Sequence, residues 1–170
     1  SLYATPSIGI SLFPTDGQDT GTLLRNADSA MYHAKSAGRN NHQFYASRMN
    51  EAAGERLRLE RALRLAVAAI SPSGSEFSLH FQPQINASTG QVIGLEALLR
   101  WNSPTFGAVS PLRFIGIAEE TGLIVQLGEW VIREAIAEAA TWPDHLSVSI
   151  NLSPAQMRSP GLISCIVNTL

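Results

Sequence analysis

Strand patterns and helix patterns alternate along this chain, and that alternation is the strongest constraint on its fold. Residues 7–13, 77–85 and 92–99 alternate apolar with small or polar side chains, as strands do. Several of the other segments carry apolar residues every three or four positions, which is typical of amphipathic helices. The order of these segments predicts an α/β fold.

The first 45 residues predict a strand, a helix and a second strand. Asp19 or Thr20 is expected to cap the helix at its start, and Gly38 is expected to end it. Residues 42–45 predict the second strand. A unit of this size cannot bury both faces of a sheet, so we expect it to expose core surface.

A long amphipathic helix is predicted over residues 46–70, before a break at the Ser-Pro-Ser-Gly-Ser segment 71–75. Glu60 and Arg64 form a pair four residues apart in the favourable order. The helix lacks the bulky aromatics of a membrane-surface helix, so we interpret it as a connector packed on its neighbours. Arg56 interrupts its apolar stripe, which consists of Met49, Ala52, Leu59, Leu63, Ala66 and Ile70.

After the break, the pattern predicts the opening units of a sheet with covering helices. Residues 77–85 and 92–99 are two strands that could pair as a hairpin. A helix is expected from Ser110–Pro111 to Gly122, a longer one over 125–141, and a third strand over 146–152. Helices and strands of this length favour a parallel sheet or barrel, although three strands cannot close an eight-stranded barrel.

Polar side chains at two predicted strand ends are the main candidates for chemistry. Glu96 lies late in the second strand after the break, Arg100 follows four residues on, and Asn151 ends the third strand. In a parallel barrel such side chains meet at one mouth. Carboxylate and amide oxygens suit Mg²⁺ or Mn²⁺, an arginine can bind phosphate, and together they serve phosphodiester hydrolysis. By spacing alone the signal is weak, since a lone Glu and Asn at strand ends are more often structural caps or surface groups.

The remaining ionisable residues give weaker signals. Lys35 and Arg39 lie on and just beyond the end of the first predicted helix, where cations are favoured by the helix dipole. The four histidines are scattered without the spacing of metal ligands, and we assign them no role.

Composition argues against several functional classes. The net charge of −2 gives no indication of a surface for nucleic acid or an anionic membrane. No run of 18 or more apolar residues is present, so no membrane span is expected. The single cysteine, Cys165, excludes an internal disulfide, suits a reducing compartment and is expected to be a buried small hydrophobe.

Short strings along nearly the whole chain resemble two bacterial signalling domains, in family order. The strings that resemble the C-terminal part of GGDEF domains are residues 7–10, 23–35 and 38–40. The strings that resemble EAL domains are residues 81–84, 96–101, 118–124 and 149–153, with Gln156. Residues 61–64 resemble the helix that joins the two domains. The chain therefore resembles a tandem GGDEF–EAL cyclic-di-GMP signalling protein.

This resemblance implies domain boundaries and a fold class. Residues 1–45 are expected to be the C-terminal part of a GGDEF domain, and residues 46–75 the connector helix and linker. Residues 76–170 are expected to be the truncated N-terminal part of an EAL domain. The implied fold is α/β, with a partial GGDEF element, the connector helix and the first units of an EAL-type (β/α) barrel similar to a TIM barrel.

The resemblance also implies roles for individual residues. Glu96 matches the signature glutamate and Asn151 an asparagine, both ligands of the divalent metals, Mg²⁺ or Mn²⁺, that activate water. Gln82, Leu99 and Arg100 match residues that bind the substrate, cyclic di-GMP, with Arg100 contacting a phosphate. In the first region, Lys35 and Arg39 match basic residues that contact the triphosphate of GTP in active GGDEF domains.

The function implied for the parent protein is hydrolysis of cyclic di-GMP to linear pGpG. The chain alone is expected to be inactive, because the GGDEF signature loop and the later EAL strands with the remaining acidic ligands lie outside it. Two alternatives stay open: an inactive cyclic-di-GMP receptor, or a parent acting mainly as a diguanylate cyclase. We also expect a cytoplasmic protein, with a membrane anchor allowed upstream, that forms a homodimer through its EAL domain and contacts neither nucleic acid nor membrane in this segment.

Overall fold

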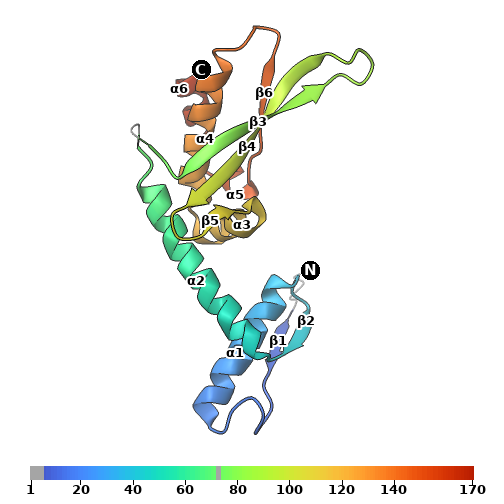
Figure 1. Ribbon diagram of the computed structural model, residues 1–170, viewed down its shortest axis with the longest axis vertical. Helices are drawn as coiled ribbons and strands as arrows, with labels where there is room; N and C mark the ends of the chain where they lie inside the picture. Colours follow the sequence, from blue (N-terminus) through green and yellow to red (C-terminus); the bar gives the residue numbers. More distant parts are fainter. Residues whose placement is uncertain (1–5, 72–73) are drawn as a thin grey trace. The chain divides into compact units, whose positions relative to one another are not determined.

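The computed structural model describes residues 6–71 and 74–170, and the chain divides into two compact units, Ser1–Arg58 and Leu59–Leu170. Figure 1 shows the first unit in blue to cyan and the second in green to red. Each unit has its own sheet. Within the described ranges, no helix combines the length and the apolar content that a membrane crossing needs.

The first unit consists of a strand, a helix and a second strand, as the sequence predicted, and the structure pairs the two strands in parallel. β1 (Ser7–Ile10) pairs in parallel with β2 (Asn41–Phe44), and α1 (Thr20–Ser36) packs on both strands. A Cβ at Gly9 would collide with the backbone of α1 at Ala27 and Met31, so glycine is what allows the helix to approach so closely. β1 is shorter than predicted because the Leu12 amide already donates to the Asp16 carboxylate in the following turn, at 2.7 Å.

Both ends of α1 follow the predicted chemistry. Asp19 is the N-cap: its carboxylate accepts from the Thr22 amide at 2.9 Å and from the Thr22 hydroxyl at 2.6 Å. These bonds, the hydroxyl first, lower the pKa of Asp19 below its ordinary value. At the other end Gly38 has a φ of 101°, a left-handed conformation that favours glycine.

α2 (Ser47–Ala68) is the predicted connector helix, and its residues belong to both units. In the first unit Met49 is buried, and the Arg56 guanidinium lies 5.4 Å from the centre of the Tyr32 ring. In the second unit four of its apolar side chains join the core: Leu59, Leu63, Ala66 and Val67. The side chain of Ala52, which the sequence placed on the same stripe, lies outside what is described.

The sheet of the second unit is built around one long strand. β4 (Val92–Ser103) pairs antiparallel with β3 (Phe77–Ile85) along one edge, which confirms the predicted hairpin. Its other edge pairs in parallel with β6 (Ser147–Ile150) and antiparallel with β5 (Gly107–Val109). β5 was not predicted, because three residues are too few to show a period. The sheet is open, as expected from the number of strands.

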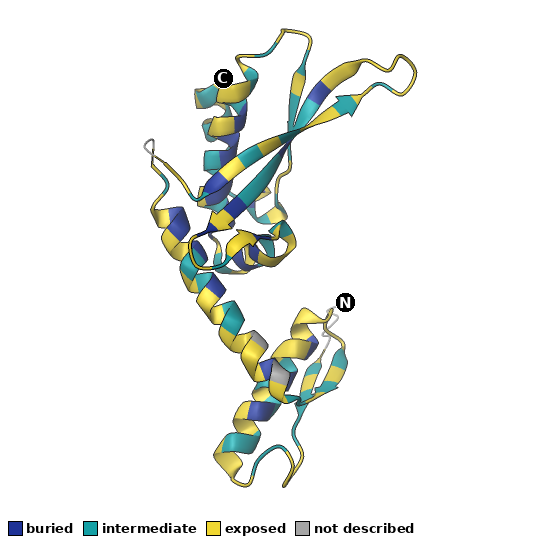
Figure 2. Cartoon of the chain, viewed as in Figure 1, coloured by how far each residue is buried: buried dark blue, intermediate teal, exposed yellow. Residues whose placement is uncertain are grey.

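Four helices follow the strands of the second unit: α3 (Pro111–Thr121), α4 (Ile124–Ala139), α5 (Pro154–Met157) and α6 (Leu162–Thr169). Figure 2 shows the buried positions of α4 in dark blue. The two helices predicted over 110–122 and 125–141 are thus confirmed to within two residues. Cys165 on α6 is only partly buried, so the prediction of a buried cysteine was wrong; α6 packs on the outside of α4, with the Cys165 sulfur 4.0 Å from the Glu129 carbonyl oxygen.

The core of the second unit contains an aromatic cluster among aliphatic side chains. Trp101, which is 2% exposed, has its ring centre 5.8 Å from Phe77 and 5.5 Å from Phe114. Its indole N–H donates to the Glu76 carboxylate at 2.9 Å, so the one polar atom of the ring is satisfied.

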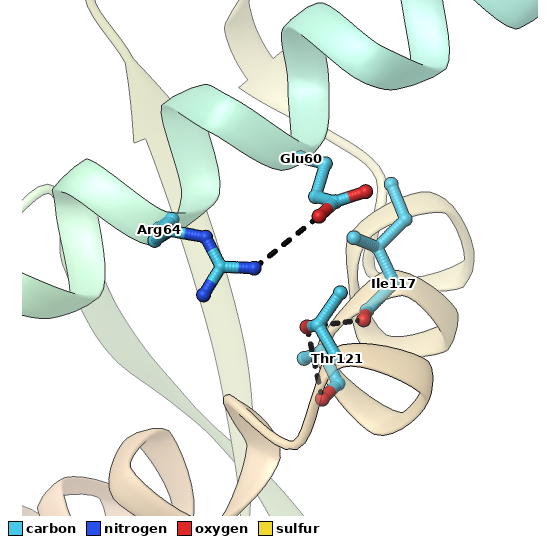
Figure 3. Close-up of polar contacts among 5 residues, drawn as sticks. Glu60, Arg64, Ile117 and Thr121 are labelled. Carbon is cyan, nitrogen blue, oxygen red and sulfur yellow. Dashed lines mark hydrogen bonds and ion pairs between the residues drawn. The ribbon is translucent and has the colours of Figure 1, made fainter.

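The C-terminal half of α2 packs into this core. Figure 3 shows it beside α3. The predicted Glu60–Arg64 ion pair forms at 3.3 Å. Both side chains are partly exposed, so the pair contributes only a few tenths of a kcal/mol, roughly. On α3 the Thr121 hydroxyl donates to the Ile117 carbonyl at 2.7 Å, which satisfies it within its own helix. Burial of apolar side chains, rather than these polar contacts, therefore holds the C-terminal half of α2 in the second unit.

Replacing Leu63 by alanine tests whether this half of α2 is part of the second unit's core. Leu63 is fully buried, so we expect Leu63→Ala to lower the free energy of unfolding by about 2–5 kcal/mol. Leu65→Ala is the matched control, because Leu65 is 63% exposed on the same helix and should change that free energy by less than about 0.5 kcal/mol. Urea unfolding of both variants measures the difference, and equal losses would contradict the packing.

Replacing Asp19 tests the cap of α1 through its pH dependence. Because folding lowers the pKa of Asp19, the cap contributes stability above the unfolded-state pKa and loses it as the pH falls through the folded-state pKa. The melting temperature of Asp19→Ala should therefore lie below that of the wild type at pH 7, and the gap should narrow in acid. Asp19→Asn, which still accepts hydrogen bonds but does not titrate, should show no such narrowing relative to Asp19→Ala. A gap that widens in acid would be incompatible with this cap.

Candidate functional site

Three strands of the second unit place polar side chains in one row. Gln82 on β3 and Ser149 on β6 are the register partners of Glu96 on β4. Directly paired residues project to the same face of a sheet, so these three side chains share a face. Ser149 also bridges toward β3, where its hydroxyl donates to the Gln84 side chain at 3.2 Å.

Glu96 and Asn151 are in direct contact. The Asn151 Nδ2 amide donates to Glu96 Oε1 at 2.6 Å. Asn151 immediately follows Ile150, the last residue of β6, which pairs with Ala97 of β4. Parallel pairing therefore brings together two side chains that are 55 positions apart in the sequence. Glu96 was expected near the end of its strand, but β4 continues to Ser103 because its last residues pair with β5.

The two faces of β4 differ in character. Ala97 and Trp101 are buried against the helices, and Leu99 packs against the same core. Glu96 and Arg100 alternate with them and project to the opposite face, on which Gln82 also lies. Leu99, which the resemblance assigned to substrate binding, thus has its side chain on the helix-covered face. Its carbonyl oxygen instead accepts a hydrogen bond from the Arg100 guanidinium at 3.0 Å.

A cavity of about 370 Å³ lies behind β4 on the helix side and reaches the turn that carries Asn151. Its walls are residues 97–100 of β4, parts of α3 and α4, residues 151–154, and Gln156. Most of this lining is apolar. Asn151 and Arg100 therefore border a polar face on one side and an apolar pocket on the other.

The turn after β6 is hydrogen-bonded to α3, which belongs to the layer of helices that covers β4. The sequence did not predict this contact. The Ser153 hydroxyl donates to Glu119 Oε1 on α3 at 2.6 Å, and its amide donates to Gln156 Oε1 at 2.9 Å. Ser153 and Gln156 form a reciprocal capping box at the start of α5. Ser153–Pro154 predicted a helical turn, and the three-residue spacing of Ser153 and Gln156 is the sequence signal that could have predicted its capping box.

The donor set fits part of a site for a hard divalent cation. Glu96 supplies carboxylate oxygens and Asn151 an amide oxygen, which are the ligand types that Mg²⁺ and Mn²⁺ prefer. In the described ranges, no group of three or more His, Cys, Asp or Glu side chains is arranged to hold a metal. The pair thus supplies a minority of the six ligands of an octahedral ion.

Lys35 and Arg39 belong to the first unit and are not part of this pair. Both side chains are exposed, Lys35 in the last turn of α1 and Arg39 beyond it with a left-handed φ of 59°. The Arg39 amide donates to the Ala34 carbonyl at 3.1 Å and so closes the helix end. Their contact with a GTP triphosphate stays a prediction.

Models of two known protein families together match most of the chain. Residues 60–170 match the family model of the EAL domain, and residues 1–41 match that of the diguanylate cyclase, GGDEF domain. Over 168 residues the chain is 45% identical to the bifunctional diguanylate cyclase/cyclic di-GMP phosphodiesterase MucR of Pseudomonas aeruginosa, covering 96% of this chain and 24% of MucR. It is 38% identical over 172 residues to the cyclic di-GMP phosphodiesterase PdeR of Escherichia coli, covering 99% of this chain and 25% of PdeR.

Solved structures show the same fold. PaMucR phosphodiesterase in a c-di-GMP complex matches with a TM-score of 0.58 and 38% identity, over 66% of this chain and 45% of that one. The FimX EAL domain of Pseudomonas aeruginosa bound to c-di-GMP matches with a TM-score of 0.56 and 29% identity, over 66% of this chain and 43% of that one.

The chain spans about a fifth to a quarter of the length of the curated relatives it matches. Within them it corresponds to the C-terminal part of a GGDEF domain followed by the N-terminal part of an EAL domain. The open sheet, the match over residues 60–170 and the likeness to EAL structures all agree. The chain therefore belongs to the EAL family and carries part of a GGDEF domain ahead of its EAL segment.

Proposed function

We propose that residues 60–170 contribute to an EAL active site that hydrolyses cyclic di-GMP to linear pGpG with Mg²⁺ or Mn²⁺, in the full-length protein that contains this chain. The observation that supports the proposal is the 2.6 Å contact between Asn151 and Glu96, which brings a carboxylate and a side-chain amide from two strand segments together. The names of MucR and PdeR as cyclic di-GMP phosphodiesterases support the choice of substrate.

Glu96 and Asn151 hold the cation in this proposal. When bound, a divalent ion of this kind supplies hydroxide near neutral pH and stabilises negative charge on the phosphodiester oxygens. Glu96 would hold the ion through its carboxylate, and Asn151, whose Nδ2 donates to Glu96 Oε1 here, would supply its amide oxygen. Because two side chains leave most coordination positions open, the other ligands come from outside the described residues, and the 170-residue chain alone is expected to be inactive.

Arg100 and Gln82 bind the substrate on the same face of the sheet. Arg100 lies four residues beyond Glu96 on the same face of β4. Its guanidinium donates a hydrogen bond to the Leu99 carbonyl oxygen at 3.0 Å, which orients it. A guanidinium in this place binds one phosphate of the dinucleotide through charge-assisted hydrogen bonds. Gln82, the register partner of Glu96, lines the proposed substrate groove on this face. Leu99 contributes through its backbone carbonyl oxygen, which holds Arg100, rather than through its side chain.

In the first unit, Lys35 and Arg39 would contact the triphosphate of GTP as part of a GGDEF domain. Their exposure at the end of α1 is compatible with that role. The bifunctional name of MucR supports a parent protein that carries both activities.

Removing the negative charge of Glu96 tests the proposed hydrolysis. In the full-length protein, Glu96→Gln should lower the rate of pGpG formation by about 100-fold or more, since changes even to outer-shell groups of metal sites cost 10- to 100-fold. Product is measured by chromatography at saturating Mg²⁺ or Mn²⁺. Glu138→Gln, at an exposed position of α4, is the matched control and should leave the rate unchanged.

The outcomes separate the alternatives. Equal rates for Glu96→Gln and the wild type would contradict the proposed role of Glu96. A wild type that binds cyclic di-GMP without turnover would instead be a receptor. A wild type that only converts GTP to cyclic di-GMP would be a cyclase.

Replacing Arg100 tests phosphate binding separately from metal binding. Arg100→Ala should raise KM for cyclic di-GMP about tenfold or more, since hydrogen bonds to charged groups contribute about 1.5–3 kcal/mol. The Mg²⁺ concentration needed for half-maximal activity should stay the same. Arg133→Ala, which removes only an exposed ion pair with Glu129, is the control. An unchanged KM for Arg100→Ala would remove Arg100 from the substrate site.

A further inference from the structure

The turn that carries Asn151 is held from behind by the helix layer. Asn151 itself is exposed, and β6, which leads into the turn, has only four residues. Two residues further on, Ser153 bonds through its hydroxyl to Glu119 of α3 and through its amide to Gln156. These bonds, rather than the short strand alone, determine where the turn lies.

Gln156 is a polar residue whose side chain is buried against a glycine of α4. It is 4% exposed, and its amide group lies directly against Gly128 of α4. A Cβ at Gly128 would lie 2.5 Å from the Gln156 Cδ and would collide with Nε2. Gly128 is also buried and has an ordinary helical conformation. Glycine is therefore required here to leave space for Gln156, and not to allow an unusual backbone conformation.

A continuous series of contacts thus runs from the helix layer to the candidate metal ligands. Gly128 provides the space for Gln156, Gln156 holds the Ser153 amide at 2.9 Å, and Ser153 fixes the turn two residues after Asn151. Asn151 then contacts Glu96 at 2.6 Å. Neither Gly128 nor Gln156 touches Glu96 in any described contact.

We propose that Gly128 and Gln156 are positioning residues for Asn151. The space that Gly128 leaves in α4 accommodates the Gln156 side chain, which through Ser153 holds the Asn151 amide in contact with the Glu96 carboxylate. The consequence for metal binding rests on the proposed function, whereas the consequence for the Asn151–Glu96 contact does not. Functional groups must be held to about 0.5 Å, and supporting groups around a metal site change its affinity 10- to 100-fold.

Four variants of the full-length protein test this inference. Gly128→Ala displaces Gln156 by collision, and Gln156→Ala removes the acceptor for Ser153 without any collision. The double variant Gly128→Ala/Gln156→Ala has room for the new methyl group, so it should be no worse than Gln156→Ala alone. Gly116→Ala is the matched control, because a Cβ at Gly116 of α3 meets nothing within 4 Å.

Three measurements are needed. Crystal structures report the distance between Asn151 Nδ2 and Glu96 Oε1, a Mn²⁺ titration followed by electron paramagnetic resonance reports the metal Kd, and thermal unfolding reports Tm. We expect Gly128→Ala and Gln156→Ala each to break the Asn151–Glu96 contact and to raise the Mn²⁺ Kd about tenfold. Gly116→Ala should preserve both the contact and the Kd.

A purely structural role would lower Tm while leaving the contact and the Mn²⁺ Kd unchanged, and that result overturns the inference. Additive losses in the double variant also overturn it. If Gly128→Ala does not fold, Gln156→Ala decides the question, since it only removes atoms. If the wild type binds no Mn²⁺, the proposed function fails, and the inference is then decided by whether the Asn151–Glu96 contact survives in the variants.

Discussion

The pairing of β4 on both of its edges is the constraint on which the rest of the EAL segment depends. β3 pairs along residues 92–101, and the opposite edge pairs with β6 at residues 94–97 and with β5 at residues 101–103. This arrangement pairs much of the backbone of a twelve-residue strand and leaves its side chains to alternate between two environments. One set, with Trp101, joins the core under the helices, and the other set, with Glu96 and Arg100, lies on the polar face.

The connector helix α2 is more than a spacer, because it contributes side chains to the core of the second unit. Leu59 and Leu63 of α2 are buried in the same cluster as Trp101 and Phe114. Burial of side chains of this size contributes about 1.5–3 kcal/mol each, which far exceeds the contribution of the exposed Glu60–Arg64 pair. The match to the EAL family model from residue 60 onward agrees with this packing. The C-terminal half of the helix is therefore part of the EAL fold.

The helix layer has a second role at the candidate site. It covers the apolar face of β4, and through Glu119 and Gly128 it also fixes the turn after β6. Rigid helices can hold a turn to a smaller tolerance than a four-residue strand and an exposed loop can. Asn151 is thus supported by groups on the far side of the sheet from the carboxylate that it contacts.

The sequence by itself determined the local structure and the candidate ligands. Asp19 as a cap, the hairpin of β3 and β4 and the helix start at Pro111 followed from short patterns. Glu96 and Asn151 followed from strand-end positions and family strings as candidates, and the structure brings them into contact. Only the tertiary structure decided the length of β4, the short strand β5, the helix-side position of Leu99 and the seat of Gln156 on Gly128. The physical reason is that these features depend on pairing and packing between residues far apart in the chain, and a local pattern carries no information about which distant partner fills a given space.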